Sequence, residues 1–133
     1  MDFEEIEHTA DRAFRVQGRD LSELLVNAVR AVHALEGIRS AGETSATREL
    51  EVEGIDSESL LVNWLNEILF LEQQHQVRCE KFQIRELNGF HVRARVETRG
   101  CPGYQTGIKA VTFHNLKICK TPVGMEAEVV VDV

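Results

Sequence analysis

The chain has 133 residues, of which 43% are hydrophobic and 28% are charged, and this balance is typical of one globular domain of ordinary size. Such a composition excludes disordered, collagen-like and repeat-array proteins. The longest uninterrupted apolar run has four residues, Ile68 to Leu71, whereas ~20 are needed to cross a bilayer. We therefore expect a single domain over residues 1–133 and no membrane association.

The net charge and the cysteines indicate which kinds of binding partner and which cellular compartment to expect. The net charge is −7, with 16 acids and 6 bases in residues 1–72 but 6 acids and 9 bases in residues 73–133. Because binding to a nucleic-acid backbone depends on Lys and Arg displacing counterions, we expect no direct high-affinity contact with nucleic acid. Docking onto another protein, or holding a cation, stays open. An acidic N-terminus and cysteines without a CxxC pair predict a cytoplasmic protein with reduced thiols, at Cys79, Cys101 and Cys119.

Two strands and a helix are predicted before Gly37. The strands are expected on either side of the connection His8 to Asp11, the second of them at Ala13 to Gln17. Asp20 and Glu23 have the spacing of a capping box, and Gly37 is a typical helix stop. Between them, apolar residues recur on one helical face: Leu21, Leu24, Leu25, Ala28, Val32 and Leu35.

A second strand and helix follow. Alternation of apolar and polar residues predicts a strand at Glu49 to Glu53, and helical periodicity begins after Asp56. The apolar stripe of this helix contains Leu60, Leu61, Trp64, Leu65, Ile68 and Leu69. Because this stripe is the most apolar surface in the chain, we expect it to bury Trp64 against a sheet.

Four strands are predicted after the second helix. Between the first two, Asn88-Gly89 favours the type I′ turn of a two-residue hairpin. The overall pattern predicts an α+β fold class: a single domain with a largely antiparallel or mixed sheet covered by two helices. The four expected strands are Lys81 to Glu86, Phe90 to Glu97, Ile108 to His114, and Met125 to Val133.

The sequence contains no P-loop, GxGxxG, GxSxG or HExxH pattern, but it suggests one cluster of oxygen donors. A strand pattern continues to the end of the chain, where Asp132 and the α-carboxylate of Val133 supply oxygens beside a main-chain carbonyl. If Asp11 approaches from the connection between the first two strands, the result is an all-oxygen, anionic site. Such donors select Ca²⁺, Mg²⁺ or Mn²⁺ rather than zinc. Thr9 and Asp11 also suit turn capping, so the residues alone leave both interpretations open.

The histidines show no metal-ligand spacing. His33 and His75 are expected at the surface, at or near helix positions. For His8 and His114, a general-base role and a structural hydrogen bond are both open. His91 begins a basic stripe on one strand face, and a solvated face is favoured over contact with RNA phosphates. The stripe also contains Arg93, Arg95 and Arg99.

Four blocks in a fixed order carry a resemblance to a known family. The first is Glu7-His8-Thr9-Ala10-Asp11, the second is the helix Leu60 to Phe70, the third is Ile108 to His114, and the last is Val131-Asp132-Val133. On these blocks the sequence resembles archease, and the likeness covers essentially the whole chain. Arg12 stands where many archeases have a small or apolar residue, and its charge is expected to oppose a nearby cation.

The resemblance implies a cofactor protein for the RtcB-type RNA ligase of tRNA splicing and RNA repair. Archeases promote guanylylation of the ligase and multiple turnover, without being enzymes themselves. The family's metal site maps onto Asp11, Asp132 and Val133, which agrees with the oxygen cluster. Two other functions stay open: a chaperone or specificity factor for RNA-modifying enzymes such as methyltransferases, and a metal-dependent hydrolase using the same aspartates with His8 or His114. Neither the oligomeric state nor a role for Lys109 follows from the sequence.

Overall fold

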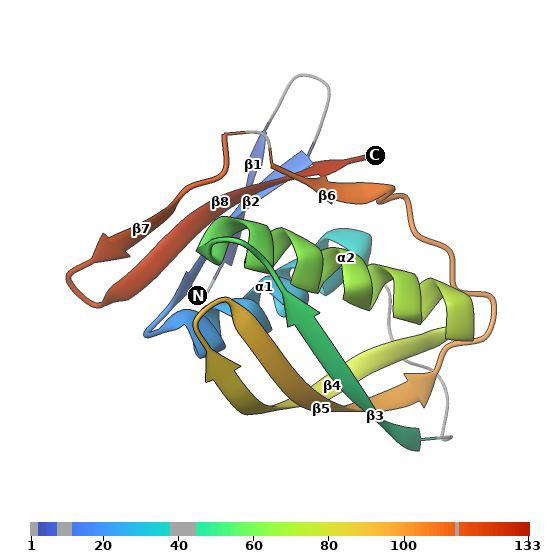
Figure 1. Cartoon of the computed structure of the whole chain (residues 1–133). Coiled ribbons are helices and arrows are strands. Elements are labelled where there is room, and N and C mark those ends of the chain that lie inside the picture. The colour runs from blue at the N-terminus through green and yellow to red at the C-terminus, as the bar shows by residue number, and fades with distance from the viewer. Residues whose placement is uncertain (1–2, 8–11, 38–44, 114) are drawn as a thin grey trace.

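The computed structural model describes residues 3–7, 12–37, 45–113 and 115–133. Within these residues, two helices and eight strands form an α+β fold in which the helices lie between two antiparallel sheets (Figure 1). The predicted fold class is confirmed, but the expected single sheet is replaced by two. The second helix packs on both sheets: its Trp64 contacts Phe82 of one sheet, while its Asn66 bonds Val111 of the other, and it buries Val62 beyond the predicted stripe.

The larger sheet holds the first and the last described strands. Its order is β1-β2-β8-β6, and β7 also pairs with β8. The Asn66 side chain of the second helix bonds both backbone groups of Val111, on β6, which explains how this short edge strand is held. β6 covers only part of the strand expected at residues 108–114, and β7 was not predicted. The bounds are β1 Phe3–Glu7, β2 Arg12–Gly18, β6 Ala110–Thr112, β7 Ile118–Thr121 and β8 Gly124–Asp132.

The smaller sheet has the order β3-β5-β4, with β3 Ser45–Glu53, β4 Val77–Asn88 and β5 His91–Gly100. The hairpin between β4 and β5 turns at Gly89-Phe90, one residue later than predicted, with Gly89 at a φ of 64°. This register places Leu87 opposite the buried Val92. A turn centred on Asn88-Gly89 would pair Val92 with a charged residue, so the hydrophobic face decides the register.

Both helices begin and end near the predicted residues. α1 spans Leu21–Glu36, with Asp20 as N-cap and Gly37 as C-cap, and α2 spans Ser57–His75 after Asp56. The predicted capping box at α1 is half formed, because the Glu23 carboxylate returns to the backbone N–H of Arg19 rather than to that of Asp20. Neither described helix combines the length and apolar character that a membrane crossing requires.

The core is centred on α2, and Trp64 lies at its middle. Trp64 is fully buried, its indole Nε1 donates to the Leu25 carbonyl at 2.9 Å, and its ring centroid lies 5.8 Å from that of Phe82. Leu61, Leu65 and Ile68 are buried in the same core cluster. The predicted packing of this stripe is therefore confirmed, with the qualification that Trp64 contacts α1 as well as the smaller sheet.

Candidate functional site

The chain ends beside the middle of the larger sheet. β8 runs to Asp132 between β2 and β6, and the Asp132 carbonyl accepts a hydrogen bond from the Lys109 backbone N–H at 2.7 Å. The predicted strand pattern at the end of the chain is therefore confirmed. One lone pair of the Asp132 carbonyl is already used, so the donors that remain fully available at this edge are carboxylates.

The predicted oxygen site falls partly outside the described residues. Asp11 lies outside them, while Arg12, the next residue, pairs with Val131 on β8. Val131 is fully buried and Asp132, which follows it in a strand, is exposed, so the Asp132 side chain projects from the face opposite the core. Val133 is 43% exposed. The described part of the site is thus an accessible edge with hard oxygen donors of the kind that Ca²⁺, Mn²⁺ or Mg²⁺ prefers.

Arg12 does not oppose a cation as freely as the sequence suggested. Its Nε and one terminal nitrogen donate to the Glu5 carboxylate at 2.8 and 3.0 Å, and the other terminal nitrogen donates to the Leu35 carbonyl at 3.0 Å. The hydrogen bond from Arg12 holds the pKa of Glu5 below its ordinary value, against the opposing effect of desolvation. Arg12 of β2 lies beside the end of β8, and its positive charge is therefore neutralised by Glu5 of β1.

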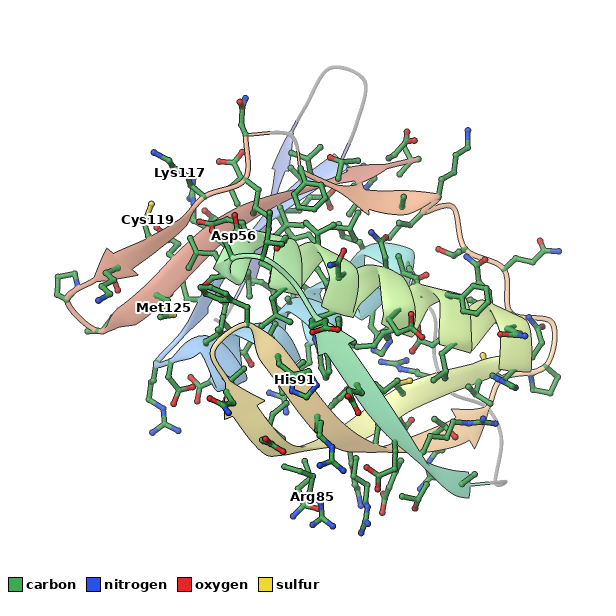
Figure 2. The ribbon with its side chains drawn as sticks, viewed as in Figure 1. Asp56, Arg85, His91, Lys117, Cys119 and Met125 are labelled. Carbon is green, nitrogen blue, oxygen red and sulfur yellow. The ribbon has the colours of Figure 1, made fainter. Side chains whose placement is uncertain are left out.

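The basic stripe on β5 is paired with acids from both neighbouring strands. His91, labelled in Figure 2, hydrogen-bonds Glu51 of β3 at 2.9 Å, and this bond lowers the pKa of the Glu51 carboxyl. The arginines form ion pairs with acids of β3 or β4: Arg93 with Glu86, Arg95 with Glu49, and Arg99 with Glu80. The expected solvated face is confirmed, and its charge is compensated within the chain.

A second cluster, which the sequence did not predict, lies where α1 and α2 end. His33 is buried rather than at the surface, so that prediction was wrong, whereas His75 is exposed as expected. The His33 Nε2 lies 2.7 Å from Oε2 of Glu72, a carboxylate that is only 1% exposed. Glu36 completes the group: one ligand atom from each residue lies within 4.8 Å of the other two. The spacing of His33 and Glu36, three residues apart on a helix, was a signal available in the sequence.

Burial raises the pKa of two groups in or beside this second cluster. It raises the pKa of the Glu36 carboxyl, with the Glu72 charge adding to the effect and the hydroxyls of Thr106 and Tyr104 opposing it. It also raises the pKa of the Cys79 thiol, which lies near Glu72. Cys79 and Cys101 are buried free thiols and Cys119 is an exposed one. His8 and His114, for which a chemical role stayed open, lie outside the described residues.

Comparison with known proteins gives one consistent result. Residues 3–133 match the model of the archease protein family (MTH1598/TM1083). The protein archease of Methanopyrus kandleri is 39% identical over 141 residues, covering 99% of each chain, and that of Methanosarcina barkeri is 35% identical over 142 residues, covering 98% of this chain and 95% of its own.

Two solved structures share the fold. One is the solution structure of Methanobacterium thermoautotrophicum protein 1598, with a TM-score of 0.71, 27% identity and 99% coverage of each chain. The other is the crystal structure of an archease, described as a possible chaperone, from Thermotoga maritima, with a TM-score of 0.73, 29% identity, and coverage of 96% of this chain and 94% of that one. The matched family, the sequence relatives and the fold agree: this chain belongs to the archease family.

Proposed function

We propose that this protein is a non-catalytic cofactor of an RtcB-type RNA ligase in the cytoplasm, where it promotes guanylylation and multiple turnover during tRNA splicing and RNA repair. Membership of the archease family supports this role. The observation that carries it is the exposed end of β8, where Asp132 and Val133 extend from a strand held on both sides. A rigid, accessible, acidic edge suits brief docking into a basic nucleotide-binding cleft.

The metal part of the proposal assigns Asp11, Asp132 and Val133 as ligands of Ca²⁺, Mn²⁺ or Mg²⁺. A bound divalent cation neutralises charge that develops when a nucleophile attacks the α-phosphate of a nucleotide. The role of this chain is to hold and orient the donor oxygens. β8 pairs with β2 as far as Val131 and with β6 at Asp132, which keeps the donors in one place when the partner docks.

Two basic residues, Lys109 and Arg12, lie beside the end of β8. The Lys109 side chain is exposed and its backbone anchors Asp132, so its charge lies close to where an anionic partner surface or a phosphate would approach. Arg12 is neutralised by Glu5. We therefore expect the cation, together with Lys109, to attract the phosphates of the bound nucleotide, while the acidic residues of the chain face the basic wall of the cleft.

A second candidate is a chaperone or specificity factor for RNA-modifying enzymes. It is favoured by the description of the Thermotoga maritima relative as a possible chaperone. Affinity capture from the source cell separates the candidates by asking which enzyme is recovered. Recovery of a methyltransferase without a ligase would favour the second candidate.

The direct test is the rate of ligase guanylylation at saturating GTP, with and without this protein, across Ca²⁺, Mn²⁺ and Mg²⁺. We expect faster guanylylation in the presence of the protein, with a dependence on the cation. The protein alone should show no hydrolysis of nucleotide or RNA, because it acts through the ligase. A ligase whose guanylylation is unchanged under every cation would contradict the proposed role.

A further inference from the structure

We infer that His33, Glu36 and Glu72 form a second, buried cation site that takes Zn²⁺. His33 and Glu36 lie on the last turns of α1, and Glu72 lies on the last turn of α2. The site shares no residue with the oxygen cluster at the end of β8. One imidazole nitrogen and two carboxylates make a donor set that suits zinc, whereas Ca²⁺ and Mg²⁺ prefer oxygen donors alone.

Each carboxylate of the cluster has one oxygen held and one oxygen left over. Oε2 of Glu72 accepts from the Cys79 backbone N–H at 2.8 Å and lies 2.7 Å from His33 Nε2. Oε2 of Glu36 accepts from the Tyr104 hydroxyl at 2.5 Å. Such anchoring is what orients carboxylates and imidazoles that bind metals.

The second oxygen of each carboxylate is available to bind a cation. Oε1 of Glu36 and Oε1 of Glu72 are both buried and accept no hydrogen bond of good geometry among the described residues, although the Thr106 hydroxyl and the Cys79 thiol lie close to these carboxylates. Only one other buried side-chain atom in the described part of the chain, Nε of Arg48, shares this condition. Unpartnered buried carboxylate oxygens are costly and call for an ion or ordered water. Two of them in one cluster, beside an imidazole, favour a cation.

Charge points the same way. Glu72 is 1% exposed and His33 is 7% exposed, so two carboxylates share a poorly solvated space with one imidazole. A divalent cation would neutralise both carboxylates. Zn²⁺ would bind the Nε2 lone pair of a neutral imidazole, so the proton between His33 Nε2 and Glu72 leaves that position: it moves to Nδ1 if the pair holds one proton, and goes to solvent if Nδ1 already carries another.

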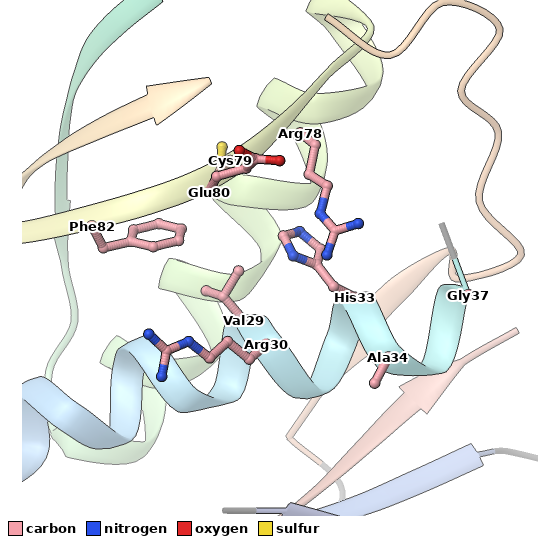
Figure 3. A pocket seen from close by; sticks show the side chains of 9 residues that line it. All are labelled: Val29, Arg30, His33, Ala34, Gly37, Arg78, Cys79, Glu80 and Phe82. Atoms are coloured by element: carbon pink, nitrogen blue, oxygen red, sulfur yellow. The ribbon is translucent and has the colours of Figure 1, made fainter. Parts of the chain in front are cut away.

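A pocket of about 520 Å³ gives access to the cluster. His33 and Cys79 line it, as Figure 3 shows, together with residues of α1 and β4. Arg30 and Arg78 line the same pocket, and their positive charge opposes the entry of a cation. We therefore expect slow loading, so binding must be measured after long equilibration.

The test measures zinc retained by the full chain after chelator treatment, equilibration with Zn²⁺ alone and removal of free metal. All proteins carry Cys119→Ser, so that the exposed thiol does not bind zinc. The variants are Glu36→Gln and Glu72→Gln. The controls are Glu80→Gln, which alters a carboxylate on the same pocket outside the cluster, and Asp132→Asn, which alters the end of β8.

We expect the parent and both controls to share a zinc equivalent that is lost in Glu36→Gln and Glu72→Gln, with affinity reduced at least tenfold, since even changes to the partners of a ligand cost about that much. Zn²⁺ should also raise the Tm of the parent and controls but not of these variants. If Glu72→Gln does not fold, Glu36→Gln decides, because Glu36 is only partly buried. Zinc retention and a Tm shift equal to the parent's in Glu36→Gln, or no zinc retained by the parent, would overturn the inference.

Discussion

At the scale of single residues, Trp64 is the largest fully buried side chain in the described part of the chain. It is fully buried and joins α2 to α1 through the Leu25 carbonyl and to β4 through Phe82. We expect Trp64→Ala to lower the free energy of unfolding by ~3–5 kcal/mol. Denaturant unfolding followed by circular dichroism measures the change.

The matched control for this substitution lies on the same helix. Phe70 is 60% exposed, so Phe70→Ala should change stability by no more than ~0.5 kcal/mol. Equal stability of Trp64→Ala and Phe70→Ala would contradict the packing described for α2.

Glu36 makes stability depend on pH in a predictable direction. Its pKa in the folded protein is raised above the ordinary 4.5, mainly by burial. Between the unfolded and the folded pKa the native state binds more protons than the unfolded state, so this group's contribution falls as pH rises through that window. In chelator, the parent should therefore lose stability relative to Glu36→Gln as pH rises from about 4.5 towards neutrality. A stability difference between the two proteins that is constant with pH would contradict this.

At the scale of elements, the same close packing of a glycine precedes the first turn of both helices. Gly18 and Gly54 each lie two residues before an N-cap aspartate, and a Cβ added at either would lie 2.5 Å from a backbone nitrogen of the following helix, that of Leu24 or Leu60. We expect Gly18→Ala and Gly54→Ala each to cost ~1–3 kcal/mol through overpacking. Thermal unfolding of the purified variants provides the measurement.

Gly107 offers the comparison for these two glycines. No atom lies within 4 Å of a Cβ added there, and its φ is not positive. Gly107→Ala should leave stability unchanged or raise it slightly, because it restricts the unfolded chain. Tolerance of alanine at Gly18 and Gly54 to the same degree would show that the close approach is not required.

The accuracy of prediction from sequence differs between these elements for physical reasons. Both helices were predicted closely, because periodicity and N-caps such as Asp20 and Asp56 are local signals. β7 was missed since its four residues show no clear alternation. The division into two sheets depends on pairings between distant strands, and the buried position of His33 depends on Glu72, 39 residues away. The exposed end at Asp132 and Val133 was predictable because the pattern of β8 continues to it, while Asp11 stays a prediction.

At the scale of the whole molecule, the two sheets enclose the helices and leave the end of β8 accessible. Exposed Asp132 follows fully buried Val131, so the proposed metal edge can be altered without disturbing the core. Substitutions at this edge should therefore change ligase activation without changing the fold. An extension after Val133 moves the α-carboxylate, and Asp132→Ala removes a side-chain donor; neither touches a buried residue.

The most direct test of the proposed function is the rate of ligase guanylylation at saturating GTP with the parent, Asp132→Ala and a protein extended by a few residues after Val133. Glu97→Ala, which removes an exposed acid from β5, serves as the control, and circular dichroism checks that each protein is folded. We expect the parent and Glu97→Ala to activate the ligase and the other two to fail, because a hard cation compensates poorly for a lost carboxylate. Full activation by both Asp132→Ala and the extended protein would contradict metal presentation at the end of β8.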